Sequence, residues 1–328
     1  MIIKKLSEIK KILFENVNNY SKIALLTHKN PDGDGLPACL ALQEILSQQK
    51  IKSDIILEEE PSEIYDFLAG FERVKVFSEY MIYDLLIFLD CHEEERIGIC
   101  EPLIPTAKKI IAIDHHLLNE PIDNADTYID VSAVSAGAII FNMFKAEIEK
   151  FKEGSANYIA KAIYTSIIND TDNFLNQNVD ENTFLICSQL MKYKINPGRI
   201  TELFLLNKPA NEIRFVGEVL STIETYDNDQ ILFMHADNSM LRRNKISHEG
   251  NSKLTSWVKG TQNVKVAVLY HQVVKNRYRL SLRSNYINVN KIAVKYGGGG
   301  HEKASGCEMK GSLEELKNTI LKDIREQL

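Results

Sequence analysis

Residues 110–116, Ile-Ile-Ala-Ile-Asp-His-His, join an apolar run to three polar side chains. The apolar run predicts a buried strand, so Asp114, His115 and His116 would lie where this strand emerges into a loop. Carboxylate and imidazole groups packed this densely are costly to bury, and divalent metal ions bind such mixtures of oxygen and nitrogen ligands. A solvated turn with two incidental histidines is the alternative, because short motifs also occur by chance. The rest of the chain decides between the two.

A second segment follows the same plan nearer the N-terminus. Residues 22–27 predict a buried strand, and the loop 28–35 that follows contains a proline and two glycines, which favour a tight turn. A helix over 36–48 and a strand over 53–58 would complete a β-α-β unit with parallel strands. Asp and Gly are common turn residues, but a turn does not require a histidine at the strand end. The potential ligands in this loop are His28, Asp32 and Asp34.

Two further strands and a helix also end in potential ligands. A buried strand over 84–89 ends at Asp90, and the strand over 108–113 ends at the triplet. Sites in open α/β sheets gather at the carboxyl edge of the strands, so three separate strand ends would meet there. An apolar helix over 156–169 ends at Asp170, where a carboxylate is unfavourable for the helix dipole unless a cation lies nearby. A shared metal site is therefore the better interpretation.

Composition limits the class of protein. The chain has 328 residues, 44% of them apolar and 26% charged, which is typical of a soluble protein of about two domains. Five scattered cysteines without a C-x-x-C pair predict reduced thiols and a cytoplasmic location. No apolar run approaches the length of a membrane span, so no membrane partner is expected.

The charge is unevenly distributed along the chain. Residues 231–310 contain 14 Lys/Arg and 4 Asp/Glu, a balance of +10, whereas the remainder holds 25 Lys/Arg and 41 Asp/Glu, a balance of −16. The acidic part can bind cations and the basic part can bind an anion such as a phosphate group. An overall charge of −6 argues against a long footprint on duplex DNA.

A second, smaller domain is predicted from residue 228 onward. Strands over 231–234, 264–271 and 277–283 precede the run Gly297-Gly298-Gly299-Gly300-His301, and a helix over 312–327 closes the chain. Consecutive glycines expose backbone N–H groups that can surround an anion, although a flexible turn is the simpler reading. We thus predict an α/β protein with a parallel-sheet domain over 1–195, a helical linker over 196–227 and an α/β substrate-binding domain over 228–328.

Taken together, these motifs resemble the DHH phosphoesterase superfamily, and the resemblance covers nearly the whole chain. Residues 28–34 look like its first motif, Asp90 its second, the Asp-His-His triplet its third, and Asp170-Thr171 its fourth. Arg283-Ser284 and the glycine run, with Ala304 and Gly306, look like the DHH-associated substrate domain. Within the superfamily, the chain is most similar to the bacterial branch of bifunctional oligoribonucleases and pAp phosphatases.

The resemblance implies a site with two divalent metal ions. Manganese is the expected metal, because the ligands are carboxylates and imidazoles without thiolate. By position, one ion would be held by His28, Asp32 and Asp90. The other would be held by Asp34, Asp90, His115 and Asp170, so that Asp90 bridges the ions.

The resemblance also assigns the remaining site residues. His116 would face the substrate as an acid or phosphate ligand, and Asp114 would orient an imidazole. With Asp90 they make up the expected catalytic set. The expected substrate-binding residues are Arg283, Ser284, Gly298, Gly299, Gly300 and His301.

The sequence departs from the family pattern at a few positions. Pro37-Ala38 stands where Gly-Ser is frequent, Asp172 where Gly often follows Asp-Thr, and Ser305 where Ala is usual. None of these changes removes a ligand. The pattern assigns no role to His92. This histidine could support the metal ligands, but we expect it to lie at the surface.

The implied activity is hydrolysis of short single-stranded RNA to mononucleotides, with removal of phosphate from 3′-phosphoadenosine 5′-phosphate (pAp), by a hydroxide that two metal ions activate. A phosphodiesterase for cyclic or linear dinucleotides is the nearest alternative, and a pyrophosphatase ranks lower. A non-catalytic nucleotide sensor is the alternative from another class, but such proteins usually lose ligands. Oligomeric state is left open, with a homodimer as one option.

Overall fold

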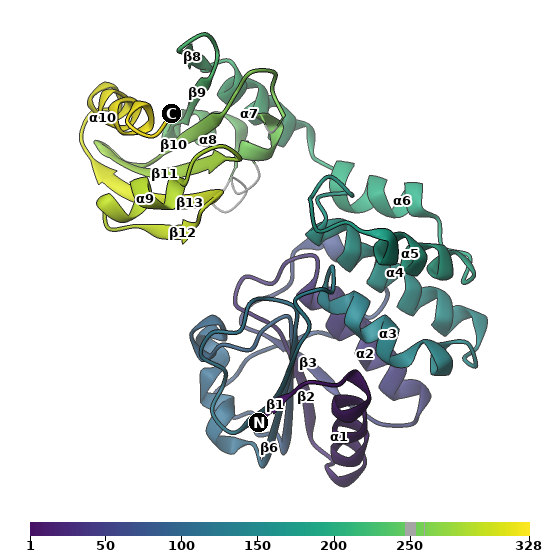
Figure 1. Ribbon diagram of the computed structural model, residues 1–328. Coiled ribbons are helices and arrows are strands. Elements are labelled where there is room, and N and C mark those ends of the chain that lie inside the picture. The colour runs from purple at the N-terminus through teal and green to yellow at the C-terminus, as the bar shows by residue number, and fades with distance from the viewer. Residues whose placement is uncertain (247–253, 259) are drawn as a thin grey trace. The chain divides into compact units, whose positions relative to one another are not determined.

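The computed structural model describes residues 1–246, 254–258 and 260–328. The chain divides into two compact units, Met1–Asn207 and Lys208–Leu328 (Figure 1). This division falls inside the predicted linker, and the two predicted boundaries, at 195/196 and 227/228, stay predictions.

The first unit is built on a sheet of seven strands in the order β1-β7-β6-β5-β2-β3-β4, and every neighbouring pair is parallel. The central strands are buried along most of their length, because helices or 3₁₀ segments cover both faces of the sheet. The strands are β1 (Ile2–Ile3), β2 (Ile23–Leu26), β3 (Asp54–Leu57), β4 (Lys75–Val76), β5 (Leu85–Leu89), β6 (Lys109–Asp114) and β7 (Ala125–Ile129).

Helices cover one face of this sheet and shorter segments cover the other (Figure 1). The larger core joins one face of the strands to apolar side chains of five helices. The smaller core lies on the opposite face and includes the 3₁₀ segment η4 (Gly98–Thr106). The five helices are α1 (Leu6–Asn19), α2 (Gly35–Gln48), α3 (Ala136–Ile148), α4 (Glu153–Asp170) and α5 (Glu181–Met191).

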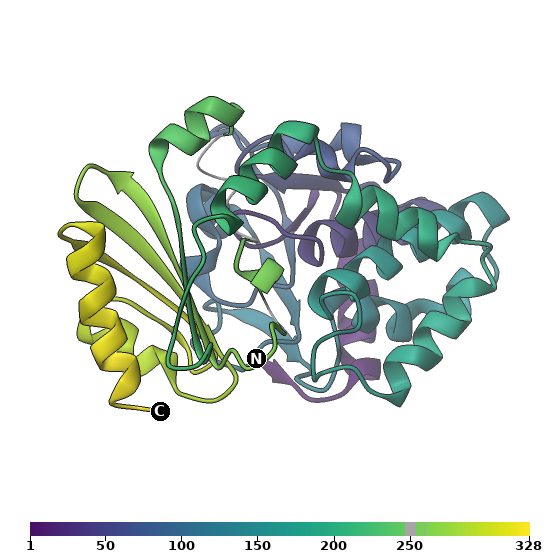
Figure 2. The ribbon, with the colours of Figure 1, turned by 90° about the horizontal axis from the view of Figure 1, so that it is seen from above.

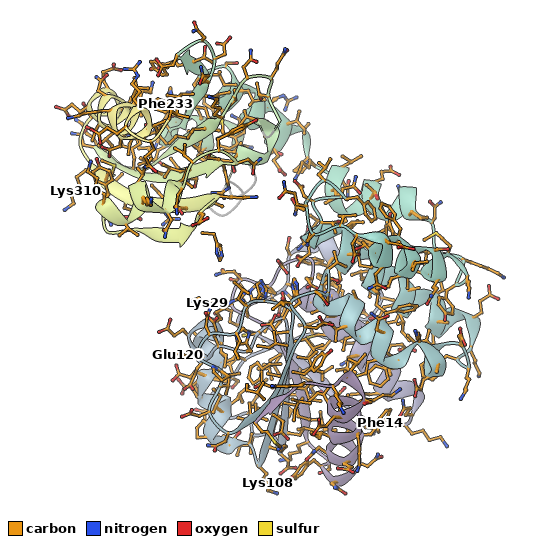
Figure 3. All side chains as sticks on the ribbon, in the orientation of Figure 1. Phe14, Lys29, Lys108, Glu120, Phe233 and Lys310 are labelled. Carbon is orange, nitrogen blue, oxygen red and sulfur yellow. The ribbon has the colours of Figure 1, made fainter. Side chains whose placement is uncertain are left out.

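The strand order places a switch point between β2 and β5. From β2 the chain first continues to β3 and β4 on one side, and it then returns to add β5 and β6 on the other side of β2. The loops after β2 and β5 therefore leave the carboxyl edge in opposite directions and open a crevice, where ligands of open α/β sheets bind. Figure 3 shows Lys29, just after β2, at one end of the sheet and Lys108, just before β6, at the other.

The connection to the second unit consists of short helical segments. These are α6 (Pro197–Thr201), the π-helical turn η5 (Glu202–Leu206) and α7 (Ala210–Leu220), and residues 207–209 between η5 and α7 belong to no helix.

The second unit contains a six-stranded sheet in the order β12-β13-β11-β10-β9-β8, in which only β10 and β9 run parallel. Helices α9 (Val289–Lys295) and α10 (Leu313–Arg325) cover one face, and α7 and α8 (Asn238–Asn244) pack on the other. Figure 2 shows α10 lying along its face of this sheet. The strands are β8 (Glu224–Tyr226), β9 (Ile231–Ala236), β10 (Val266–Val274), β11 (Arg277–Ser284), β12 (Gly299–His301) and β13 (Ala304–Lys310), and a 3₁₀ segment η7 spans Leu254–Val258.

The α/β class and the two sheets were predicted correctly, but the interior strands β7 and β13 and the edge strands were not. Strands β1, β4, β8 and β12 have only two or three residues each, too few for a periodic pattern. No helix in the described parts of the chain is long and apolar enough to cross a membrane.

Candidate metal centre

The carboxyl edge of the first sheet brings the predicted ligands together from four places in the sequence. Strands β2, β5 and β6 are neighbours, with Leu26 paired to Phe88 and Leu89 paired to Ile113. The residues that follow these pairs therefore leave the sheet side by side, and the end of α4 adds Asp170. All six predicted metal ligands belong to groups of side chains whose ligand atoms lie within 4.8 Å of one another.

The first group consists of His28, Asp32 and Asp90. The Nε2 atom of His28 lies 3.4 Å from Oδ2 of Asp90 and 3.7 Å from Oδ1 of Asp32. Oδ1 of Asp32 also accepts hydrogen bonds from the backbone N–H groups of Asp34 and Gly35. This turn fixes the direction of the first carboxylate.

The second group consists of Asp34, His115 and Asp170. The Nε2 atom of His115 lies 2.9 Å from Oδ2 of Asp170, 3.3 Å from Oδ2 of Asp34 and 3.4 Å from Oδ1 of Asp90. Asp90 thus directs one carboxylate oxygen toward each group. This is the arrangement that a ligand shared by two ions requires.

The backbone of Asp90 is also unusual. Its φ angle is +59°, in the left-handed region that residues with a Cβ rarely adopt. Its N–H donates to the carbonyl of Ile113, which holds the residue against β6 in this conformation. Strained conformations of this kind concentrate at functional sites.

The electrostatics of the site favour a bound cation. Although burial lowers it, contacts with Asp32 and Asp90 raise the pKa of His28 to about 10. Burial, together with the charges of Asp90 and Asp170, raises the pKa of Asp34 to about 7. Carboxylates crowded in this way repel one another, and a bound cation would relieve the repulsion.

Two orphaned atoms support the fit of metal ions. Oδ1 of Asp90 and Nε2 of His115 are buried and lie within ion-pair distance of each other, but neither forms a hydrogen bond of good geometry within the described residues. Unpartnered buried polar atoms are costly, and both of these atoms point at the same cluster. With four carboxylates, two imidazoles and no thiolate in the two groups, the donor set fits a hard or borderline divalent ion.

Asp34 is held by residues that sequence reasoning missed. It is fully buried and accepts hydrogen bonds from the first N–H groups of α3, those of Ala136 and Gly137, at 2.7 and 3.1 Å. The hydroxyl of Ser166 on α4 donates to Oδ1 of Asp34 at 2.6 Å and accepts a bond from Gly137 N–H. A helix N-terminus stabilises a carboxylate. A serine inside an apolar helix carries no signal of this role.

Asn169 is a second missed residue. Its side-chain amide donates to Oδ2 of Asp32 at 3.2 Å and to Oδ1 of Asp170 at 3.0 Å, so it links one carboxylate of each group. The polar run that begins at Asn169 after an apolar helix was a usable signal for it.

His92 is not the surface histidine that was expected. Its side chain is 0% exposed, and Nδ1 lies 2.5 Å from Oδ2 of Asp114. The other oxygen of Asp114 accepts from the ring of His116 at 2.8 Å and from two backbone N–H groups, those of His115 and His116. The predicted orienting contact between Asp114 and an imidazole is present, and it reaches two histidines.

In the second unit, Arg283 and His301 lie on the same side of the sheet. Arg283 on β11 pairs with Ala304 on β13, which pairs with His301 on β12. Residues directly opposite one another point to the same face, so the small Ala304 separates a guanidinium from an imidazole. Burial lowers the pKa of Arg283, and in the described residues no carboxylate forms an ion pair with it.

Ser284 differs from the other expected substrate contacts. Its hydroxyl donates to the carbonyl of Lys265 and accepts from the N–H groups of Tyr286 and Ile287. These contacts stabilise the turn after β11 and leave the hydroxyl little capacity for a substrate.

The four glycines are not the open loop that was expected, because part of the run is strand β12. Gly297, with φ of +73°, ends α9 with the paired bonds of a Schellman motif. A Cβ on Gly298 would lie 2.1 Å from the carbonyl oxygen of Gly306, whereas a Cβ on Gly299 would meet open space. Packing against β13 thus explains why several of these residues are glycines.

The comparisons with known proteins agree with this arrangement. Residues 22–167 match the DHH family, N-terminal domain, and residues 242–328 match the DHHA1 domain. The chain is 24% identical over 316 residues to the bifunctional oligoribonuclease and PAP phosphatase NrnA of Mycoplasma pneumoniae, which covers 95% of this chain and 94% of that relative. It is also 25% identical over 299 residues to the protein of the same name in Bacillus subtilis. That match covers 90% of this chain and 92% of the relative.

A solved structure extends the match to the fold. The structure of an exopolyphosphatase-related protein from Bacteroides fragilis aligns with this chain with a TM-score of 0.86 and 20% identity. The alignment covers 98% of this chain and 96% of the Bacteroides chain. The two matched domains follow one another in the order that the motifs predict. The chain therefore belongs to the DHH family, with an N-terminal DHH domain followed by a DHHA1 domain.

Proposed function

We propose that this protein is a metal-dependent phosphoester hydrolase that degrades short RNA oligonucleotides to mononucleotides and converts pAp to AMP. The observation that carries the proposal is the division of Asp90 between two ligand groups, with Oδ1 and Oδ2 each 3.4 Å from a different imidazole nitrogen. Relatives over nearly the whole chain are named oligoribonuclease and PAP phosphatase, which supports the substrate class.

The proposed ions are two divalent cations, with manganese as the expected metal. His28, Asp32 and Asp90 would hold one ion, and Asp34, Asp90, His115 and Asp170 would hold the other. When bound, two such ions supply a water of lowered pKa and neutralise the charge of a phosphoryl group. The absence of thiolate from both groups favours manganese or magnesium over a structural zinc.

The chain's own residues would position the substrate and move a proton. The ring of His116 is 43% exposed, and its Nδ1 atom contacts Oδ1 of Asp114. Nε2 is therefore the atom available to a phosphate or a leaving oxygen. The contact with Asp114 raises the pKa of His116, which favours the protonated ring that an acid needs. In the second unit, Arg283 and His301 would bind a phosphate of the nucleotide beside Ala304.

A substrate panel tests the proposal. The wild-type chain and Asp90→Asn would be incubated with manganese and a five-residue RNA, a linear dinucleotide, a cyclic dinucleotide, pAp or pyrophosphate, and the products separated by chromatography. We expect mononucleotides from the RNA and AMP from pAp, both lost on chelation and in the variant. Hydrolysis confined to the cyclic dinucleotide or to pyrophosphate would assign another substrate class, and binding without hydrolysis would indicate a nucleotide sensor.

A further inference from the structure

His92 is a buried histidine whose two ring nitrogens both have partners. Nδ1 lies 2.5 Å from Oδ2 of Asp114, and Nε2 lies 3.4 Å from the backbone N–H of Asn119. A carboxylate oxygen accepts, so Nδ1 donates its proton to Asp114, while Nε2 also lies 3.6 Å from Oε1 of Glu93. The side chain is 0% exposed, so water does not compete for these contacts.

Asp114 depends on this donor more than on any other single one. Three donors share Oδ1, namely the N–H groups of His115 and His116 and the Nδ1 atom of His116. In the described part of the chain, His92 is the hydrogen-bond donor to Oδ2. Without it, a fully buried carboxylate oxygen would lack a partner, and the carboxylate would be free to rotate toward another donor.

The orientation of His116 follows from that of Asp114. The ring of His116 is partly exposed, and its Nδ1 atom contacts Oδ1 of Asp114 at 2.8 Å. A turn of the carboxylate would release this nitrogen, and the ring could then flip and present either nitrogen to the substrate. A buried carboxylate that fixes the tautomer and direction of an imidazole is a general device for proton transfer.

We infer that His92 is a positioning residue that acts through Asp114 to hold His116 in the orientation needed for phosphoester hydrolysis. This inference rests on the proposed function, in which His116 meets the substrate. Within the described residues, the polar partners of His92 are Asp114, Asn119 and Glu93, none of which is among the six proposed metal ligands. The family pattern assigns His92 no role.

The chemistry of the contact selects the test variants. In His92→Asn, the side-chain N–H group can occupy nearly the place of Nδ1 and keep the bond to Asp114. His92→Phe keeps the ring volume but removes the donor. His92→Gln keeps an amide, but its N–H reaches the place of Nε2 instead. Tyr83→Phe is a matched control, because it removes a side-chain donor to a carboxylate, that of Asp54, at the opposite end of β5.

Steady-state kinetics at saturating manganese measure the effect on kcat and KM separately. Loss of a contact that orients an active-site side chain typically costs about 10- to 100-fold in activity. We expect that loss in the kcat of His92→Phe and His92→Gln, with little change in KM. The activity of His92→Asn should stay within about threefold of wild type. Tyr83→Phe should keep the wild-type kcat. If His92→Phe does not fold, the comparison of the Asn and Gln variants is sufficient. Equal kcat in the donor-keeping and donor-lacking variants would overturn the inference.

A second readout does not depend on activity. In the metal-free protein labelled with ¹⁵N-histidine, the ring N–H of His116 should exchange slowly with water in wild type and His92→Asn. It should exchange at least about tenfold faster in His92→Gln, since its acceptor is no longer fixed. Unchanged exchange would contradict the positioning role even if kcat fell. Failure of the wild type on every substrate would reject the proposed function, and the exchange comparison would still decide the role of His92.

Discussion

At the scale of single residues, the candidate centre is defined by how each carboxylate is held. Asp32 is fixed by a turn, Asp34 by the N-terminus of α3, and Asp114 by His92. The clustering of the proposed ligands could be predicted from sequence because Asp and His stand at the ends of apolar runs. Their supports could not, because a serine or histidine that orients a ligand occupies no periodic position and is recognised only by its contacts.

Ser166 provides a test of such a support. Ser166→Ala removes the hydroxyl that donates to Asp34 at 2.6 Å, so this carboxylate should lose part of its fixed direction. We expect manganese affinity to fall about 10- to 100-fold. Calorimetric titration of manganese into each variant measures this change. Ser53→Ala is the matched control, since the buried hydroxyl of Ser53 has no hydrogen-bond partner among the described residues. Equal affinities in the two variants would show that Ser166 does not support the site.

His28 predicts a pH dependence of metal binding. Its pKa is raised from 6.5 to about 10 in the metal-free protein, so the ring is protonated at neutral pH and must lose a proton to bind a metal. The deprotonation of His28 should therefore make the affinity for manganese rise with pH, by up to about tenfold per pH unit below the raised pKa. Titrations of manganese at pH 6.0, 7.0 and 8.0 in buffers of different ionisation enthalpy measure both the affinity and the protons released. An affinity that is constant over this range, without proton release, would contradict the assignment of His28.

At the scale of elements, long periodic segments were predictable and short edge strands were not. The β-α-β unit of β2, α2 and β3 follows directly from its apolar runs and its turn residues. Strand β12 does not, because a run of glycines has no side-chain pattern and reads as a loop. Its conformation depends on pairing with β13, a contact within the sheet that local sequence does not encode.

Neighbouring glycines at the start of β12 allow a controlled test of this packing. Gly298→Ala places a methyl group 2.1 Å from the carbonyl oxygen of Gly306, which requires the backbone to shift. We expect the free energy of unfolding of the second unit to fall by about 1–3 kcal/mol. Chemical denaturation followed by circular dichroism measures this change. Gly299→Ala meets open space and should stay within about 0.5 kcal/mol of wild type; a larger loss there than in Gly298→Ala would show that packing on β13 does not fix this run.

At the scale of the whole molecule, the chain combines two units with separate cores. The first carries every predicted metal ligand, and the second carries Arg283 and His301 on one face of its sheet. The sequence indicated this division through its charge, acidic before residue 231 and basic after it. It indicated the junction only as a linker over 196–227, and the division between Asn207 and Lys208 falls within that range.

Hydrolysis of a five-residue RNA by the intact chain, with saturating manganese, tests the two-ion centre most directly. Asp90→Asn removes the charge that both ligand groups share, and Asp84→Asn makes the same chemical change at the opposite end of β5, where Asp84 pairs with Lys108 at the surface. Because loss of a ligand shared by two metals removes most of their stabilisation of the reacting phosphate, kcat should fall by at least about 1,000-fold in Asp90→Asn and stay at the wild-type value in Asp84→Asn. A folded Asp90→Asn variant with kcat within about tenfold of wild type would contradict the account.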